Sequence, residues 1–254
     1  MFKKSDFIIP FISSVILFSI SITVVGCNGG MQNHAMVQDT GYGNLGPEEF
    51  QKGFSSGNAI LLDVRTPEEI AAGGIPGAST IDFYDPEFET RINLMDKSKS
   101  IYVYCHAGGR SAKAAQLLIN NGFAHVYNLQ GGMTAWEEKG LPVEVSVQSK
   151  DENIRQMTLQ EFNESLDSPL PVLVDFHTQW CAPCRQMAPL VDELEKEMQG
   201  KAMVLRMDVD KSKEVAKSFG IKGVPVFVLF KNGKEVARKT GAMGKSDLIQ
   251  FISQ

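Results

Sequence analysis

The chain has 254 residues, of which 43% are hydrophobic, and its formal net charge is −5. This length and apolar fraction predict two ordinary globular domains. The acidic balance provides no basic surface for nucleic acid, so no nucleic-acid partner is expected. The four cysteines occur in three separate places, as Cys27, as Cys105 and as the close pair Cys181 and Cys184.

Residues 1–26 have the composition of an export signal. Two lysines, Lys3 and Lys4, precede an apolar run from Phe7 to Val25, and small residues come before Cys27. The segment resembles a bacterial lipoprotein signal, which implies removal of residues 1–26 and lipidation of Cys27. That lipid would anchor the protein to a membrane of the bacterial envelope, facing the periplasm or the surface. An uncleaved membrane anchor is the alternative, because the run approaches the length that spans a bilayer.

Residues 27–43 are rich in Gly, Asn and Gln and lack apolar periodicity. This composition predicts a flexible tether between the lipid and the first domain.

Strand-like and helix-like segments then alternate through residues 44–145. Expected strands cover residues 59–64, 100–105 and 125–129, and expected helices begin at Thr66 and cover residues 111–120. The alternation predicts an α/β domain with a parallel sheet and helices on both faces. In such a sheet the natural site is a loop at the carboxyl end of a strand.

The loop after the second of these strands contains Cys105, His106, Ala107, Gly108, Gly109 and Arg110. A cysteine at a strand end, followed by glycines and a helix start, can be surrounded by backbone N–H groups that stabilise a thiolate. The planar, two-pronged guanidinium of Arg110 is suited to binding an oxyanion. The loop therefore predicts a nucleophilic thiol beside an anion site, and the alternative is a buried, inert cysteine.

This loop resembles the Cys-x-x-Gly-x-Arg active site of single-domain rhodanese-type sulfurtransferases. Further matching segments are Asp63-Val64-Arg65, Gly73-Gly74-Ile75-Pro76-Gly77-Ala78 and Gly131-Gly132-Met133-Thr134-Ala135-Trp136. The resemblance implies sulfane-sulfur transfer through a Cys105 persulfide, with residues 106–110 binding a donor such as thiosulfate. Gly74 departs from the histidine that is usual in the family, which we attribute to packing away from the sulfur. The alternative is a non-catalytic module that binds an anionic or thiol partner.

A polar linker is expected over residues 146–156 and a second domain over residues 157–254. Its central feature is a strand, Val172 to Phe176, followed by Cys181 and Cys184 at the start of a helix. Two intervening residues place the thiols on one helical turn, with Cα atoms roughly 5 to 6 Å apart, within the range of a disulfide. The helix start favours a thiolate at Cys181.

Two other interpretations of this pair are weaker. Half of a zinc site would need further ligands, but Cys27 and Cys105 lack a ligand-spaced histidine, so no metal is expected. A purely structural disulfide that closes so small a loop would stabilise the fold little.

The segment Trp180-Cys181-Ala182-Pro183-Cys184 resembles the active site of thioredoxins. The resemblance implies a mixed sheet with flanking helices, proton transfer by a buried Asp175, a cis peptide bond before Pro225, and contact of Trp180 with substrate. Asn232-Gly233 independently predicts a type I′ hairpin turn. Ala182, His177 and Val226 depart from the usual Gly, Trp and Thr.

Together these features predict an envelope thiol-disulfide oxidoreductase that is coupled with sulfane-sulfur transfer. Its expected partners are protein thiol and disulfide clients, a sulfane-sulfur donor, an external electron donor and the membrane; no cofactor is expected. The alternative is a thioredoxin-like reductase whose first domain only binds.

Overall fold

The computed structural model describes residues 41–145 and 156–254. The predicted signal segment 1–26, the lipidation site Cys27, the tether up to residue 40 and nearly all of the predicted linker lie outside these ranges. Within the two ranges, no helix is both long enough and apolar enough to span a membrane.

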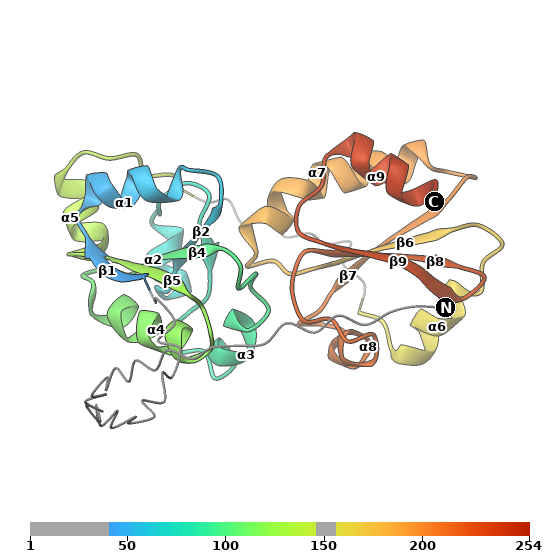
Figure 1. Cartoon of the computed structure of the whole chain (residues 1–254), viewed down its shortest axis with the longest axis horizontal. Helices are drawn as coiled ribbons and strands as arrows, with labels where there is room; N and C mark the ends of the chain where they lie inside the picture. The colour runs from blue at the N-terminus through green and yellow to red at the C-terminus, as the bar shows by residue number, and fades with distance from the viewer. Residues whose placement is uncertain (1–40, 146–155) are drawn as a thin grey trace, which may run out of the picture. The chain divides into compact units, whose positions relative to one another are not determined.

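The first domain is built on a five-stranded sheet with the order β1-β5-β4-β2-β3 (Figure 1). All of its strand pairs are parallel. The strands are β1 (Gly41–Leu45), β2 (Ala59–Asp63), β3 (Ser79–Thr80), β4 (Ser100–Tyr104) and β5 (His125–Leu129). The helices are α1 (Pro47–Phe54), α2 (Pro67–Ala71), α3 (Phe88–Ile92), α4 (Gly109–Asn120) and α5 (Gly132–Glu138).

Helices cover both faces of this sheet (Figure 1). Residues from α1 and α5, such as Phe50 and Trp136, pack with Leu61 and Tyr102 in one cluster. Leu118 of α4 packs against the other face, on the alternate residues of the same strands: Leu62, Ile101 and Val103. Side chains alternate between the faces of a strand, so strands buried on both sides must be apolar nearly throughout.

The predicted tether, residues 27–43, extends too far, because residues 41–43 belong to the first strand of the sheet. Strand β1 pairs in register with β5, from Gly41 opposite His125 to Leu45 opposite Leu129. The Asn128 side chain also donates a hydrogen bond to Asn44, at 2.8 Å. A short edge strand is held by main-chain hydrogen bonds, so its Gly-rich sequence shows no apolar periodicity.

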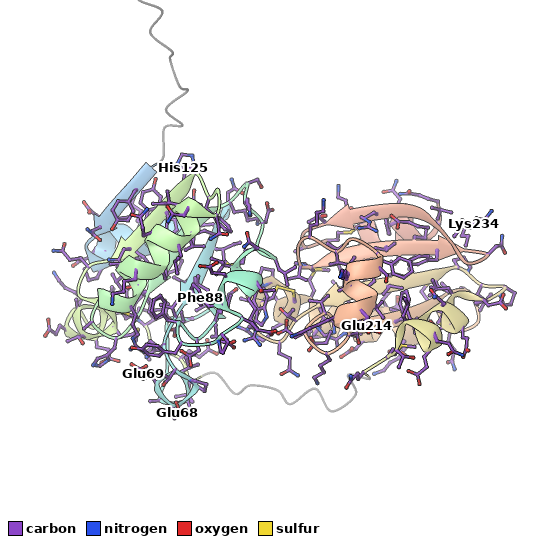
Figure 2. The ribbon with its side chains drawn as sticks, turned by 90° about the horizontal axis from the view of Figure 1, so that it is seen from below. Glu68, Glu69, Phe88, His125, Glu214 and Lys234 are labelled. Carbon is purple, nitrogen blue, oxygen red and sulfur yellow. A yellow bond between two sulfur atoms is a disulfide. The ribbon has the colours of Figure 1, made fainter. Side chains whose placement is uncertain are left out.

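Two helix starts depend on local capping. Helix α2 begins with a capping box, in which Thr66 and Glu69 each accept a hydrogen bond from the other's backbone N–H. Glu68 and Glu69 are neighbours on this helix (Figure 2). Helix α4 begins at Gly109, two residues before the predicted Ser111, because Gly108 adopts a left-handed conformation with φ of 91°.

The second domain contains a mixed four-stranded sheet with the order β7-β6-β8-β9. Strand β6 is parallel to β7 and antiparallel to β8, and β8 is antiparallel to β9. The strands are β6 (Val172–His177), β7 (Met203–Asp208), β8 (Val226–Lys231) and β9 (Lys234–Thr240). The helices are α6 (Leu159–Leu166), α7 (Ala182–Glu197), α8 (Lys213–Ser218) and α9 (Lys245–Ile252).

Helices α7 and α9 lie on one face of this sheet, and α6 and α8 lie on the other (Figure 1). Leu173 and Phe227 pack with α7 and α9 residues, whereas Val174 and Phe176 face α6 and α8. Both central residues of the β8–β9 turn have positive φ, 50° at Asn232 and 73° at Gly233. The predicted type I′ hairpin is therefore confirmed, as is the predicted α/β fold class of both domains.

Candidate active sites

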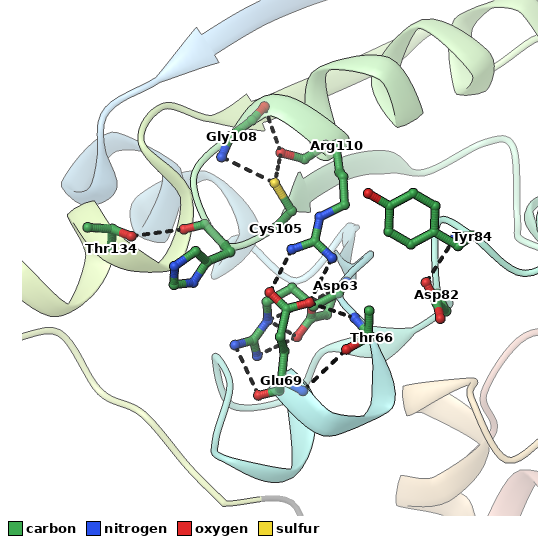
Figure 3. A network of polar contacts seen from close by, with 12 residues as sticks. Asp63, Thr66, Glu69, Asp82, Tyr84, Cys105, Gly108, Arg110 and Thr134 are labelled. Atoms are coloured by element: carbon green, nitrogen blue, oxygen red, sulfur yellow. Dashed lines mark hydrogen bonds and ion pairs between the residues drawn. The ribbon is translucent and has the colours of Figure 1, made fainter.

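The Cys105 thiol lies where β4 ends and α4 begins, and it is buried. Its sulfur accepts hydrogen bonds from the backbone N–H of Gly108 at 3.2 Å and from the hydroxyl of Ser111 at 3.3 Å (Figure 3). The Ser111 hydroxyl also approaches the Gly108 carbonyl, at 3.2 Å. The predicted loop therefore wraps its donors around the sulfur.

These donors change the acidity of the thiol. Burial raises the pKa of Cys105, but hydrogen bonds from the Ser111 side chain and from backbone N–H groups of the loop outweigh it. The net result is a pKa lowered from the usual value for cysteine, which increases the fraction of the nucleophilic thiolate.

The start of α5 holds the Cys105 loop in place through backbone hydrogen bonds. Backbone N–H groups of Met133 and Thr134 donate to the carbonyls of Cys105 and His106, at 2.9 and 3.1 Å. Gly132 lies so close that a Cβ atom there would be 2.5 Å from the Cys105 carbonyl oxygen. This close backbone approach therefore requires glycine at position 132.

Arg110 is held by a residue that the sequence analysis did not assign to the site. Its Nη1 and Nη2 atoms donate to Glu69 Oε2 and Oε1, at 2.7 and 2.6 Å (Figure 3). The Tyr84 ring lies against the guanidinium, with its centroid 5.9 Å from Cζ. The hydrogen bonds from Arg110 lower the pKa of Glu69 to about 2. The predicted anion-binding arginine is thus paired with a carboxylate of its own chain.

The other predicted donor-binding residues contribute mainly through the backbone. The exposed positions of the loop are His106, Ala107 and Gly109. Gly108 donates its backbone N–H to the Cys105 sulfur. A second, buried ion pair lies below α2, where Arg65 donates to both carboxylate oxygens of Asp63.

The unusual Gly74 is explained by this buried pair. A Cβ atom on Gly74 would lie 2.9 Å from Arg65 Nη2 and 3.1 Å from the Tyr104 hydroxyl. The Tyr104 hydroxyl itself accepts a hydrogen bond from Ile75 N at 3.0 Å. Arg65 and Tyr104 therefore fill the space that a side chain at position 74 would occupy.

Cys181 and Cys184 form a disulfide with Cα atoms 5.2 Å apart. Cys181 is the N-cap of α7, and its sulfur accepts a hydrogen bond from Cys184 N at 3.2 Å. Cys184 lies within the first turn. The partial positive charge of a helix start is therefore directed at Cys181, which favours its thiolate when the disulfide is reduced.

Asp175 lies on β6 and shares the α7-covered face of the sheet with Leu173, since both occupy alternate positions of the strand. Only 2% of Asp175 is exposed. Burial raises its pKa to about 7, against the opposing effect of Arg206, whose Nε lies 3.7 Å from Oδ2. Arg206 also contacts Asp192 of α7 at 3.1 Å. A carboxyl with this pKa can exchange a proton with a thiol at neutral pH.

Two further predicted residues lie at the same end of β6. The Val224–Pro225 peptide bond is cis, and Val226 pairs with Phe176, which places Pro225 beside the end of β6. Trp180 precedes the cysteines, and its Nε1 donates to Asp210 at 3.1 Å. Among the residues that the structure describes, no cluster of three His, Cys, Asp or Glu side chains could hold a metal ion.

Comparison with known proteins gives a consistent division of the chain. Residues 46–139 match the rhodanese-like domain family, and residues 153–254 match the thioredoxin family. A thioredoxin of Rickettsia conorii is 43% identical over 91 residues, which cover 36% of this chain and 87% of that protein. Thioredoxin 1 of Nostoc sp. is 42% identical over 91 residues, covering 36% and 85% of the two chains. A Haemophilus influenzae thioredoxin is 40% identical over 89 residues, covering 35% and 83%.

Proposed function

The chain belongs to the thioredoxin family and carries a rhodanese-like domain before its thioredoxin domain, and from this we propose a thiol-disulfide oxidoreductase coupled with sulfane-sulfur transfer. Cys181 and Cys184 form the redox pair, and Cys105 carries sulfur as a persulfide. The observation that supports the second activity most directly is the pair of hydrogen-bond donors, Gly108 N and Ser111 Oγ, on the Cys105 sulfur.

In the redox reaction, the Cys181 thiolate attacks one sulfur of a client disulfide and the other client sulfur leaves as a thiolate. Cys184, after giving its proton to Asp175, then attacks the Cys181 sulfur. This second attack forms the Cys181–Cys184 disulfide and releases the remaining client thiolate. The client gains two electrons, and an external electron donor must reduce the pair again.

In the sulfur-transfer reaction, the Cys105 thiolate attacks the outer sulfur of a donor. The S–S bond of the donor breaks, the carrier leaves as an anion, and Cys105 keeps the sulfur as a persulfide. The hydrogen-bond donors around Cys105 stabilise the attacking thiolate and the persulfide anion alike. A competing function is a binding module without turnover, because Arg110 is paired with Glu69 rather than open to an anion.

Mapping of sulfur on the full chain distinguishes the two functions. A reduced full chain that carries Cys181→Ser and Cys184→Ser, and so cannot reduce a persulfide, is incubated with thiosulfate or with a small persulfide, and its peptides are analysed for added sulfur. Sulfur transfer predicts one added sulfur on Cys105, lost in Cys105→Ser. If neither donor adds sulfur to Cys105, the domain only binds.

The redox assignment has its own test. In Cys184→Ser, mixed disulfides with clients should accumulate on Cys181, because the second attack is removed. The matched variant, Cys181→Ser, should trap few clients. Trapping mainly through Cys184 in Cys181→Ser would reverse the two roles.

We also propose that the protein works in the bacterial envelope, anchored by a lipid on Cys27. The support comes from the sequence alone: charged residues, an apolar run and small residues before Cys27. Mass spectrometry of protein from the membrane fraction should find lipid on Cys27 and no residues 1–26. Membrane protein that retains Met1 would contradict this assignment.

A further inference from the structure

The Arg110–Glu69 ion pair determines the charge next to Cys105. Both terminal nitrogens of Arg110 are bound to the two carboxylate oxygens of Glu69, in a bidentate geometry at 2.6 and 2.7 Å. Bidentate arginine–carboxylate pairs are among the stronger polar contacts in proteins. The pair is only partly exposed, with 18% of the arginine side chain and 28% of the glutamate side chain accessible.

Glu69 is also fixed independently of Arg110. Its carboxylate accepts a hydrogen bond from Thr66 N at 3.0 Å, as part of the capping box of α2. Because its pKa is lowered to about 2, the carboxylate remains ionised throughout the neutral and mildly acidic range. A neighbouring Arg65 offers no replacement charge, because it is paired with Asp63. Arg110 and Arg65 are therefore each paired with a carboxylate.

The two possible classes of sulfur donor, thiosulfate and persulfides, differ in the charge that they require near Cys105. Thiosulfate is a dianion, with its charge shared between the outer sulfur and the sulfonate oxygens, and the sulfonate end needs a free cation to offset its loss of hydration. A persulfide R–S–SH with an uncharged carrier has no such end. A carboxylate fixed on Arg110, whose guanidinium interacts electrostatically with Cys105, disfavours the first class much more than the second.

We propose that Glu69 selects the charge class of the sulfur donor: by holding Arg110 in a neutral pair, it disfavours thiosulfate and favours persulfides of uncharged carriers. This inference rests on the proposed sulfur transfer at Cys105. Glu69 acts through Arg110, so it is a positioning and specificity residue and not one that touches the reacting sulfur.

The chemistry is the same for both donors apart from the leaving group. With R–S–SH, the Cys105 thiolate attacks the outer sulfur, the donor S–S bond breaks, and R–S⁻ leaves with the electron pair, so that Cys105–S–SH remains. With thiosulfate, the corresponding S–S bond breaks and sulfite leaves. Neither reaction requires an added oxidant or reductant, since the sulfur atom is transferred without net change in electrons.

Glu69→Gln is the variant that separates this role from a structural one. Glutamine can still accept the Thr66 hydrogen bond, because a capping box accepts either Glu or Gln at this position. It can also keep one contact with Arg110, but it removes the charge. Glu68→Gln is the matched control, since it makes the same charge change one position earlier on the exposed side of α2 (Figure 2).

The experiment measures the initial rate of sulfur addition to Cys105 in the full chain, with Cys181→Ser and Cys184→Ser present throughout to remove other acceptors. The donors are thiosulfate and 2-hydroxyethyl persulfide formed in situ. We expect Glu69→Gln to raise the thiosulfate-to-persulfide ratio of second-order rate constants about tenfold or more. Adding salt should reduce this gain. Glu68→Gln should leave the ratio unchanged.

A second variant tests whether the increase in the thiosulfate-to-persulfide ratio depends on Arg110. In Glu69→Gln/Arg110→Gln, the increased use of thiosulfate should be lost. An unchanged ratio in Glu69→Gln, or the same change in Glu68→Gln, would overturn the role of Glu69 while leaving sulfur transfer intact. Failure of both donors to add sulfur to any form, with Cys105 still open to alkylation, would instead overturn the proposed sulfur transfer and this inference with it.

Discussion

At Cys105, a single hydroxyl, that of Ser111, donates a hydrogen bond to the sulfur. The Ser111 side chain is the largest contribution that lowers the pKa of this thiol, in opposition to burial. Ser111→Ala should therefore raise the pKa and reduce the thiolate fraction at neutral pH. The rate of Cys105 alkylation by iodoacetamide at pH 7 should fall several-fold, and the midpoint of its pH profile should move upward.

Thr134→Ala is a suitable control for this prediction. It also removes one hydroxyl that bonds the same loop, but at the His106 carbonyl, 3.2 Å away, and not at the sulfur. Its alkylation profile should match that of the unmodified protein. Equal shifts in both variants would mean that general loosening of the loop, and not the hydrogen bond to the sulfur, controls the acidity.

Asp175 should make the second domain less stable as the pH rises. Its pKa is about 7 in the folded state, because of burial, and roughly 4 when unfolded. The folded state therefore binds the proton more tightly, so the favourable contribution is complete below about pH 4 and is lost as the pH rises through about 7. Asp175→Asn should abolish this loss and stabilise the domain at pH 8 by about 2 to 4 kcal/mol.

Hydrogen exchange of β6 peptides in the full chain measures this effect within one domain, with the Cys181–Cys184 disulfide kept oxidised so that thiols do not titrate. Asp192→Asn is the comparison variant, because it removes a carboxylate that shares Arg206 with Asp175. In Asp192→Asn, the protection of β6 should still depend on pH, but the midpoint of the change should lie at a lower pH. Protection of β6 that stays constant between pH 5 and pH 9 in the unmodified protein would refute the assignment.

The sequence predicts the residues that carry chemistry better than those that position them. Cys105 and Arg110 could be selected because their residue types and spacing have a chemical meaning by themselves. The Thr66–Glu69 capping pattern is also visible in the sequence, but it indicates only a helix start. Glu69 contacts Arg110, 41 positions later in the chain. This contact depends on how the segments that follow β2 and β4 meet in space. Local periodicity in the sequence carries no information about that meeting.

At the scale of elements, the apolar strands were predictable and the edge strand was not. Strands β2, β4 and β5 follow the predicted ranges closely, and for β2 and β4 the reason is that burial on both faces demands nearly continuous apolar residues. Strand β1 has the sequence GYGNL and an alternating pattern of exposure, and it is specified by pairing with β5. Pairing between segments about 80 positions apart leaves no local pattern in the sequence.

The junction between α5 and the Cys105 loop provides a test at this scale. Gly132 and Gly140 have nearly the same φ, 60° and 63°, so alanine at either position has a similar backbone cost. A Cβ atom would meet the Cys105 and His106 backbone at Gly132, but nothing within 4 Å at Gly140. Gly132→Ala should therefore destabilise the first domain by about 1 to 3 kcal/mol more than Gly140→Ala.

Thermal unfolding and Cys105 alkylation together check this comparison. Only Gly132→Ala should also slow alkylation, because its Cβ atom displaces the loop that surrounds the thiol. If the two variants have equal stability and equal reactivity, the start of α5 does not support the loop.

At the scale of the whole chain, two sites that favour thiolate attack on sulfur occur in one polypeptide. Each has its own sheet, its own helices and its own family, over residues 46–139 and 153–254. In the proposed sulfur transfer, Cys105 would hold sulfur as a persulfide, which a dithiol such as Cys181 with Cys184 can reduce. The chemistry of the first product therefore matches the chemistry that the second site performs.

We expect the second domain to reduce the persulfide made by the first. The Cys181 thiolate would take the outer sulfur of Cys105–S–SH, and Cys184 would then attack Cys181, releasing hydrosulfide and leaving the Cys181–Cys184 disulfide. The sulfur atom gains the two electrons that the dithiol loses. Residues 146–155 separate the described ranges in the sequence, and joining two sites in one chain can give effective concentrations on the order of millimolar.

The test uses intact chains that complement each other. One chain carries Cys105→Ser and the other carries Cys181→Ser and Cys184→Ser, so sulfur bound at Cys105 of one molecule can be reduced only by the dithiol of another molecule. At low micromolar concentration, the unmodified reduced protein should release its first equivalent of sulfide on the order of a hundredfold faster than this mixture. The difference should shrink as the concentration rises, because transfer between molecules is second order whereas transfer within one chain is not. If the mixture or the Cys105→Ser chain alone matches the unmodified protein at the lowest concentration, the two domains act separately, and their presence in one chain does not serve sulfur transfer.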